Sequence, residues 1–133
     1  FDLDKCRSDS EENPVFYIQY ANARINSIIK KSGTDRIDLD NLDLLNQEKE
    51  LALIKKLLNF PEIVKDSAAN YSPHKIAFYL QELSSEFHNY YKSSKILVDD
   101  KETLNARLAL ITSIKIVLVN GLDLLGVSSP DKM

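Results

Sequence analysis

The positions of glycine and proline are what most constrain how this chain can fold. Only three glycines and four prolines occur, and most of them fall between long stretches in which apolar residues recur at helical spacing. Strict alternation of apolar and polar residues, which is typical of a half-buried strand, is rare. The sequence therefore predicts an all-α protein, a bundle of about five helices joined mostly by short connectors.

Capping residues mark the expected helix boundaries. Asn13 and Pro14 suit the start of a first helix, and Gly33 suits its end. An acidic connector at 35–46 follows, with room for one short helix. The remaining helices are expected over 48–59, from Pro61 onward, from Ser72 and Pro73 to about 96, and from Asp99 or Asp100 to Gly126.

Length and composition exclude several classes of protein. The chain has 133 residues, enough for one domain with a single core. It has no apolar run of the roughly 20 residues that a membrane span needs. Two histidines and one cysteine are too few for a structural zinc site, and the low cysteine content suits a reducing, cytoplasmic location. Because the chain starts with Phe1, we expect it to be a piece of a longer protein.

The charge balance is mildly acidic. Seventeen basic and twenty acidic residues give a net charge of −3, whereas a dedicated nucleic-acid binder is usually basic. The acids are concentrated, however, with five acids against two bases in 1–12 and six against two in 35–50. The rest of the chain has a surplus of bases, so a moderately basic surface remains compatible with the sequence.

The first expected helix has three distinct faces. Its core side is apolar and consists of Ile18, Ala21, Ile25, Ile28 and Ile29, while Gln19, Asn22 and Asn26 face away. Between these faces lies a stripe formed by Tyr17, Tyr20 and Arg24. A tyrosine four residues from an arginine offers a stacking surface and a cation together, which suits an unpaired base and its phosphate. The alternative is a Tyr–Arg pair at the rim of the core.

The fourth expected helix carries a second stripe beside its core face. The core face consists of Ile76, Tyr79, Leu80, Leu83, Phe87 and Tyr90, and the stripe of Ala77, Ser84, His88, Tyr91 and Lys95. The stripe predicts a shallow groove in which a base stacks on Tyr91 and a phosphate lies near Lys95. The alternative is an aromatic rim that faces another helix, with His88 as an ordinary boundary histidine.

The last expected helix has two unusual residues on its broad apolar face. Arg107 projects from the middle of this face, where a buried guanidinium needs a partner. Two interpretations remain open: a structural ion pair, or a position at the mouth of a ligand groove. Gly121 lies inside the helix at a cost of about 1 kcal/mol relative to alanine, which predicts close approach of another backbone.

Catalytic motifs are absent from the sequence. It has no phosphate-binding glycine loop, no G-x-S-x-G, no HExxH and no EF-hand loop. Glu82 and Glu86 lie one turn apart but face away from the groove stripe. We therefore expect no catalytic residue and no metal site in this chain, and a small helical enzyme has no residue set to support it.

Several segments, taken in order, resemble the C-terminal domain of arginyl-tRNA synthetases. The first helix contains NPVFYIQYANAR at 13–24, and the last contains ARLAL at 106–110 and VLVNGLDLLGV at 117–127, followed by PDKM at 130–133. Between them stand FPE at 60–62, PHKIAFYLQEL at 73–83 and FHNYY at 87–91. The order, spacing and shared end point make this resemblance specific. Residues 1–12 resemble the exit segment from that family's catalytic domain.

The resemblance implies a DALR-type anticodon-binding helical bundle over 13–133. The parent enzyme would be an arginine–tRNA ligase of class I, which activates arginine with ATP and Mg²⁺ in a separate catalytic domain and charges tRNA(Arg). Its HIGH-like and KMSK-like motifs do not occur in this sequence. The implied partners of the chain are the anticodon stem-loop of tRNA(Arg) and the parent's catalytic domain, and no membrane is implied.

The resemblance also implies individual anticodon contacts. Tyr20 and Arg24 match the family's tyrosine and arginine on the first helix, Tyr91 matches a tyrosine on the fourth, and Met133 matches the terminal methionine. Tyr17, His88, Lys95 and Arg107 are possible additional contacts that rest on the residue pattern alone. The four letters of the DALR motif do not occur consecutively in this sequence, although NARL stands at 105–108, and Lys132 stands where an arginine is common.

A second class of function fits the same residues. A helical protein–protein interaction module could use this aromatic rim as a docking surface, because interface anchors and RNA-stacking residues have similar compositions. Salt dependence of binding separates the two functions. The sequence also predicts a tail at 128–133 that is mobile without RNA, since it has little apolar content.

Overall fold

The computed structural model describes residues 13–131 and 133, and within them it is helical without strands. The elements are α2 (Pro14–Ser32), the 3-10 turn η1 (Leu42–Leu44), α3 (Glu48–Leu58), α4 (Phe60–Ala69), α5 (His74–Ser93) and α6 (Lys101–Leu124). The predicted all-α bundle is confirmed. The proposed exit segment at 1–12 and Lys132 lie outside the described residues.

Three of the predicted caps are confirmed, at both ends of α2 and at the start of α6, whereas α5 begins at His74 without a side-chain cap and ends at Ser93, before the predicted end near 96. The Asn13 side chain accepts a hydrogen bond of 3.0 Å from the Val15 amide, and Gly33 ends α2 in the left-handed conformation with φ 67°. Asp100, and not Asp99, caps the start of α6, because its carboxylate accepts a hydrogen bond of 3.0 Å from the Thr103 backbone amide. A hydrogen bond of 2.6 Å from the Thr103 hydroxyl, followed by the one from the Thr103 backbone amide, lowers the pKa of Asp100.

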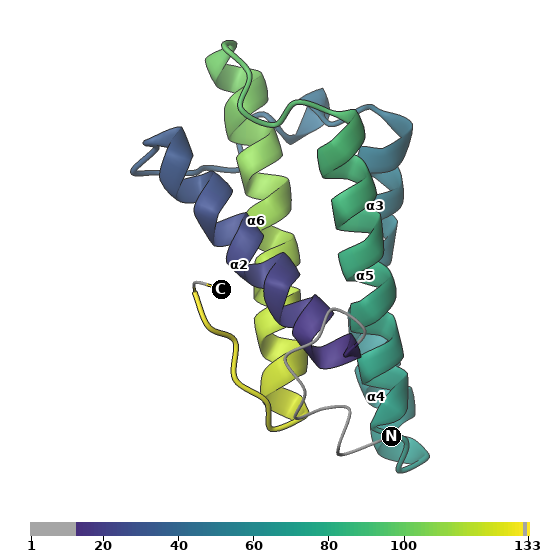
Figure 1. Ribbon diagram of the computed structural model, residues 1–133. Helices are drawn as coiled ribbons and strands as arrows, with labels where there is room; N and C mark the ends of the chain where they lie inside the picture. Colours follow the sequence, from purple (N-terminus) through teal and green to yellow (C-terminus); the bar gives the residue numbers. More distant parts are fainter. Residues whose placement is uncertain (1–12, 132) are drawn as a thin grey trace.

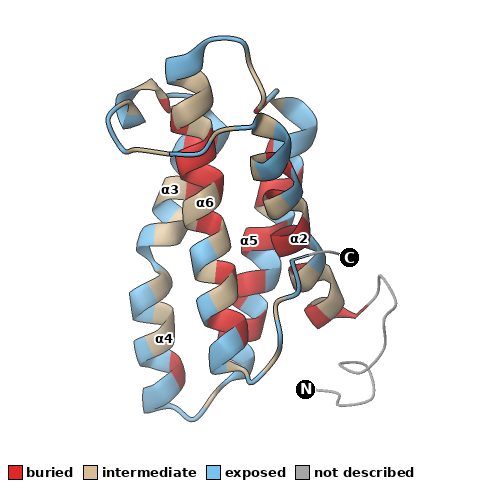
Figure 2. Ribbon diagram, turned by 90° about the vertical axis from the view of Figure 1, so that its left-hand side faces the viewer, coloured by how far each residue is buried: buried red, intermediate tan, exposed pale blue. Residues whose placement is uncertain are grey.

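Three long helices form the centre of the bundle. α2 packs against both α5 and α6, which also pack against each other, while α3 and α4 cover another side of α5 (Figure 1). Buried residues gather where these helices face one another, and the outer faces are exposed (Figure 2). The predicted core positions of α2 and α5 are buried, apart from Ile29, which is partly buried against the core.

Gly121 has a different neighbour from the one that the sequence predicts. A Cβ atom at this position would lie 2.6 Å from both Cδ atoms of Leu80, so α6 approaches the side chain of Leu80 on α5 and not another backbone. The expectation of a backbone contact is therefore wrong. The close approach itself is real, and it lets Leu80 pack without exposure to solvent.

The C-terminal tail lies along α2. In Figure 1 it leaves the lower end of α6 and turns back beside α2. The Gln19 amide donates to the Ser128 carbonyl at 2.7 Å, and Asn26 donates to the Asp131 carboxylate at 3.3 Å. The amides on α2 thus supply polar partners that the tail's own composition does not reveal. The mobility of the tail in the absence of RNA stays a prediction.

The tail also changes the environment of Asn22. This side chain donates to the Pro130 carbonyl at 3.4 Å and is fully buried. The prediction that Asn22 faces away from the packed part of the molecule is therefore wrong. None of the described helices is both long and apolar enough to cross a lipid bilayer.

Candidate nucleic-acid interface

A cavity of about 1090 Å³ opens between α2, the end of α5, the connector to α6, and the tail. All four residues implied by the resemblance, Tyr20, Arg24, Tyr91 and Met133, line this one cavity. They come from two helices and the C-terminal residue, so only the folded chain brings them together. Tyr20, Tyr91 and Met133 are 38%, 37% and 50% exposed, so their side chains are accessible from solvent.

Arg24 lies between two tyrosine rings. Its guanidinium carbon is 5.4 Å from the ring centroid of Tyr20 and 4.7 Å from that of Tyr91. Tyr20 precedes Arg24 by one helical turn on α2, whereas Tyr91 is supplied by α5. Both distances are within the range of cation–π attraction. The arrangement provides a planar cation flanked by aromatic surfaces, which suits stacked bases and a phosphate.

His88 is buried and packs against three aromatic rings, one of which is the Tyr20 ring beside Arg24. Its ring centroid lies 5.2 Å from Tyr17, 5.8 Å from Tyr20 and 5.3 Å from Phe87, and the residue is only 8% exposed. Burial, followed by the positive charges of Arg24 and Lys92, lowers the pKa of His88 from 6.5 to about 4. His88 is therefore neutral near pH 7, and it does not add a positive charge to the cavity.

The groove that the sequence predicts along α5 is only partly present. Ala77, Ser84 and His88 are buried, and Tyr91 and Lys95 alone of that stripe line the cavity. The stripe therefore divides into a packed part and an open end. The packed part follows from the close packing of α2 against α5, which the pattern along a single helix cannot reveal.

The cavity has a basic lining that the sequence only partly predicts. In addition to Arg24 and Lys95, it is lined by Lys30, Lys31 and Lys115, with Asp131 as an acidic neighbour. Lys30 and Lys31 belong to the last turn of α2, where they complement the helix dipole, and none of these three lysines is among the site residues predicted from the sequence. In the sequence, this basic surface is indicated by the surplus of bases outside the acidic segments 1–12 and 35–50.

Arg107 lies in a structural ion pair. Its Nε atom is 3.2 Å from the Glu50 carboxylate, and Arg107 is not among the residues that line the cavity. Of the two interpretations left open by the sequence, the ion pair is confirmed. Tyr17 also lies outside the lining and contacts His88. Neither of the two side chains is placed to meet a ligand in this cavity directly.

The two glutamates that the sequence places one turn apart on α5 have different surroundings, since Glu82 is exposed and Glu86 is partly buried. Glu82 forms an ion pair of 3.0 Å with Lys56. Burial raises the pKa of Glu86, and the neighbouring Lys56 opposes this effect. Within 13–131 and Met133, no cluster of three or more histidine, cysteine, aspartate or glutamate residues could hold a metal ion.

Comparison with known proteins agrees with this arrangement. The family described as "DALR anticodon binding domain" matches residues 18–133. Proteins named arginine–tRNA ligase from Azoarcus sp. and Aromatoleum aromaticum are each 49% identical to the chain over 135 residues. These matches cover the whole chain but only 23% of each relative.

Solved structures show the same relationship. The arginyl-tRNA synthetase of Thermus thermophilus superposes on the whole chain with a TM-score of 0.83 and 31% identity, over 23% of its own length. The similarity therefore extends from sequence segments to the complete helical arrangement. The resemblance to arginyl-tRNA synthetases is confirmed over the full chain, and the chain belongs to the DALR anticodon-binding domain family.

Proposed function

We propose that this chain is the anticodon-recognition part of an arginine–tRNA ligase, and that its cavity receives the anticodon loop of tRNA(Arg). Tyr20 and Tyr91 would stack on unpaired bases, Arg24 would pair with a phosphate or stack beside them, and Met133 would contact a base from the tail. The chain would bind tRNA without performing chemistry itself. Correct docking would help to place the acceptor end at a distant active site.

The position of Arg24 between Tyr20 and Tyr91 is the observation that carries this proposal. A purely apolar protein interface would not need a cation between two accessible aromatic rings in a cavity lined by further lysines. Basic and aromatic groups together are characteristic of surfaces that bind single-stranded nucleic acid. The net charge of −3 limits the number of phosphate contacts, so we expect weak binding by the chain alone and stronger binding in the parent through effective concentration.

The parent enzyme would supply the chemistry. A separate catalytic domain, reached through the exit segment proposed at 1–12, would bind ATP with Mg²⁺ and attach arginine to the tRNA. The bundle proposed for 13–133 and that catalytic domain would be covalent partners. This role in translation would place the protein in the cytoplasm.

The proposal can be tested by titrating the 133-residue chain with an arginine-tRNA anticodon stem-loop at low salt and following NMR chemical shifts. We expect the shifts to cluster on Tyr20, Arg24, Tyr91 and Met133 and to fade as salt increases. A stem-loop of the same length with a different anticodon serves as the control for sequence preference.

Two results would contradict the proposal. Absence of shifts at millimolar stem-loop would show that this cavity is not an RNA site in the isolated chain. Shifts that persist unchanged at high salt would indicate an apolar docking surface, which is the protein-interaction function that the sequence leaves open.

A further inference from the structure

Arg107 belongs to a buried network that joins three helices. Glu50 is fully buried, and the same carboxylate oxygen that is 3.2 Å from Arg107 Nε accepts a hydrogen bond of 2.6 Å from the Tyr90 hydroxyl. The other oxygen of Glu50 accepts a hydrogen bond of 3.1 Å from the backbone amide of Gln47 and thereby caps α3. One carboxylate therefore links the start of α3, the end of α5 and the first half of α6.

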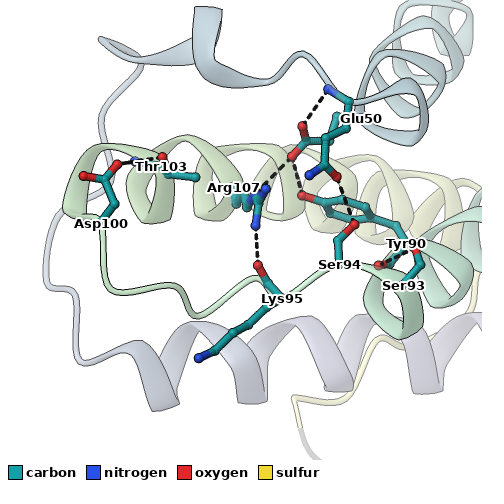
Figure 3. Close-up of polar contacts among 9 residues, drawn as sticks. Glu50, Tyr90, Ser93, Ser94, Lys95, Asp100, Thr103 and Arg107 are labelled. Atoms are coloured by element: carbon teal, nitrogen blue, oxygen red, sulfur yellow. Dashed lines mark hydrogen bonds and ion pairs between the residues drawn. The ribbon is translucent and has the colours of Figure 1, made fainter.

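The guanidinium of Arg107 also makes a second contact. Its Nη1 atom donates a hydrogen bond to the backbone carbonyl of Lys95, in the connector between α5 and α6 (Figure 3). This connector, residues 94–97, forms one wall of the cavity. In Figure 3 the Lys95 carbonyl faces Arg107 while its side chain extends in the opposite direction, and that side chain is among the groups that line the cavity.

Two further contacts from the side of α3 reach the last residue of α5 and the first residue of the connector. Ser94 donates to the Gln47 side chain at 3.0 Å, and Lys49 donates to Ser93 at 2.8 Å. These two pairs are exposed and therefore weak, whereas the Glu50–Arg107 pair is largely removed from solvent. The buried pair is the part of this network that can set the position of the connector most firmly.

An ion pair alone does not explain why this residue is an arginine. A lysine could neutralise Glu50, but it presents a single point charge on a flexible stem. The guanidinium fork can face a carboxylate with one nitrogen and a carbonyl with another while keeping both directions fixed. Tyr90 and Gln47 fix the Glu50 carboxylate, and the ion pair between this carboxylate and Arg107 Nε orients the guanidinium so that Nη1 faces the Lys95 carbonyl.

We propose that Arg107 is a positioning residue for the RNA site: anchored by Glu50, it holds the Lys95 carbonyl and so directs the Lys95 side chain into the cavity. This inference rests on the proposed function, because it assigns Arg107 an effect on a ligand that it does not touch. It also separates Arg107 from Tyr20, Arg24 and Tyr91, which line the cavity themselves.

The test compares Arg107→Lys with wild type in stem-loop affinity and in thermal stability. The lysine keeps a positive charge opposite Glu50 but lacks the second donor group of the fork. We expect the chain to stay folded and its affinity to fall about threefold to tenfold, as for the loss of one phosphate contact near 0.1 M salt. In the absence of RNA, amide shifts should change most in residues 94–97.

A double-mutant cycle distinguishes positioning from general structural damage. In a Lys95→Gln background, Arg107→Lys should cause no further loss of affinity, because the side chain that it directs is already uncharged. In a Lys115→Gln background, Arg107→Lys should lower the affinity by the same factor as it does in the wild-type chain, because Lys115 lines the same cavity from α6 and does not depend on Arg107. Equal losses in both backgrounds, or an unchanged affinity for Arg107→Lys, would overturn the inference.

A second variant covers the case in which Arg107→Lys does not fold. Glu50→Gln retains hydrogen-bonding groups toward Tyr90 and Gln47 but removes the charge that anchors Arg107, and it should reproduce the loss that depends on Lys95. Normal affinity in a folded Glu50→Gln chain would also overturn the inference. Failure of the proposed function is recognised separately, since wild type would then not bind the stem-loop at all.

Discussion

The guanidinium carbon of Arg24 lies 4.7 Å from the centroid of the Tyr91 ring, across the interface between α2 and α5. The pairing ties a cation on one helix to an aromatic ring on another. Tyr91 remains 37% exposed although Arg24 lies against it. The contact therefore orders the ring without burying it, which is the state that a stacking platform requires.

Removal of the Tyr91 ring should weaken RNA binding with little effect on stability. Base–aromatic stacking contributes about 1–3 kcal/mol per base, so Tyr91→Ala should lower stem-loop affinity by about fivefold or more, and Tyr91→Phe should retain most of it. Fluorescence anisotropy of a labelled stem-loop measures both. Phe78→Ala is the matched control, because Phe78 is an exposed aromatic residue on the same helix outside the cavity. Equal effects of the two alanine variants would exclude a specific platform.

Lys95 should contribute to the salt dependence of binding. Each phosphate contact with a single strand adds about −0.7 to the slope of log affinity against log salt. Lys95→Gln should therefore make the slope less steep by about that amount, in titrations between 50 and roughly 200 mM salt. Lys75→Gln provides the comparison, since Lys75 is exposed on α5 and does not line the cavity. An unchanged slope for Lys95→Gln would place Lys95 away from the RNA backbone.

His88 should make the protein less stable in mild acid. Its pKa is about 4 in the folded chain and 6.5 ordinarily, so the unfolded chain binds a proton first as the pH falls. Unfolding free energy should decrease from pH 6.5 toward pH 4, by as much as about 2–3 kcal/mol at 1.36 kcal/mol per pKa unit. The raised pKa of Glu86 acts in the opposite direction, so the comparison with His88→Gln isolates the histidine.

Chemical denaturation at several pH values measures this effect. The difference in unfolding free energy between wild type and His88→Gln should change between pH 6.5 and 4 and be constant above pH 7. His74→Gln is the control, because His74 is the other histidine and is exposed. A pH-independent difference for His88→Gln would mean that His88 titrates in the folded chain as it does in water.

Gly121→Ala should destabilise the bundle, although alanine is the better helix former. A Cβ at this position would lie 2.6 Å from Leu80, which is fully buried and has no solvent space to enter. Overpacking of this kind costs about 1–3 kcal/mol against a gain of about 1 kcal/mol in helix propensity, so we expect a net destabilisation of about 1 kcal/mol. Thermal unfolding measures the effect. Addition of Leu80→Ala should reduce the penalty of Gly121→Ala, and simple additivity would refute the steric explanation.

The helices and most of the core were predictable because they depend on local information. Asn13, Gly33 and Asp100 cap helices through hydrogen bonds and backbone conformations that involve only near neighbours in sequence. The apolar residues of α2 and α5 recur at helical spacing, and burial of one apolar face follows from that pattern. The acids and amides of the surface gave less information, as the buried Asn22 shows.

The candidate site was only partly predictable. The resemblance supplied Tyr20, Arg24, Tyr91 and Met133, and the structure places them around one cavity. Local pattern did not identify Lys115 as a lining residue, and it extended the groove along α5 too far. The packing of α2 on α5 determines which part of a stripe stays open, and that packing depends on contacts between distant segments.

By itself, the sequence determined the helical class, the caps of α2 and of the start of α6, and the apolar faces, because periodicity and capping act over a few residues. Tertiary structure alone decided that Arg24 meets Tyr91, that Arg107 pairs with Glu50 and holds the Lys95 carbonyl, and that the tail lies along α2. Each of these contacts joins residues far apart in the chain. Their geometry depends on how the helices pack as a whole, which no local pattern encodes.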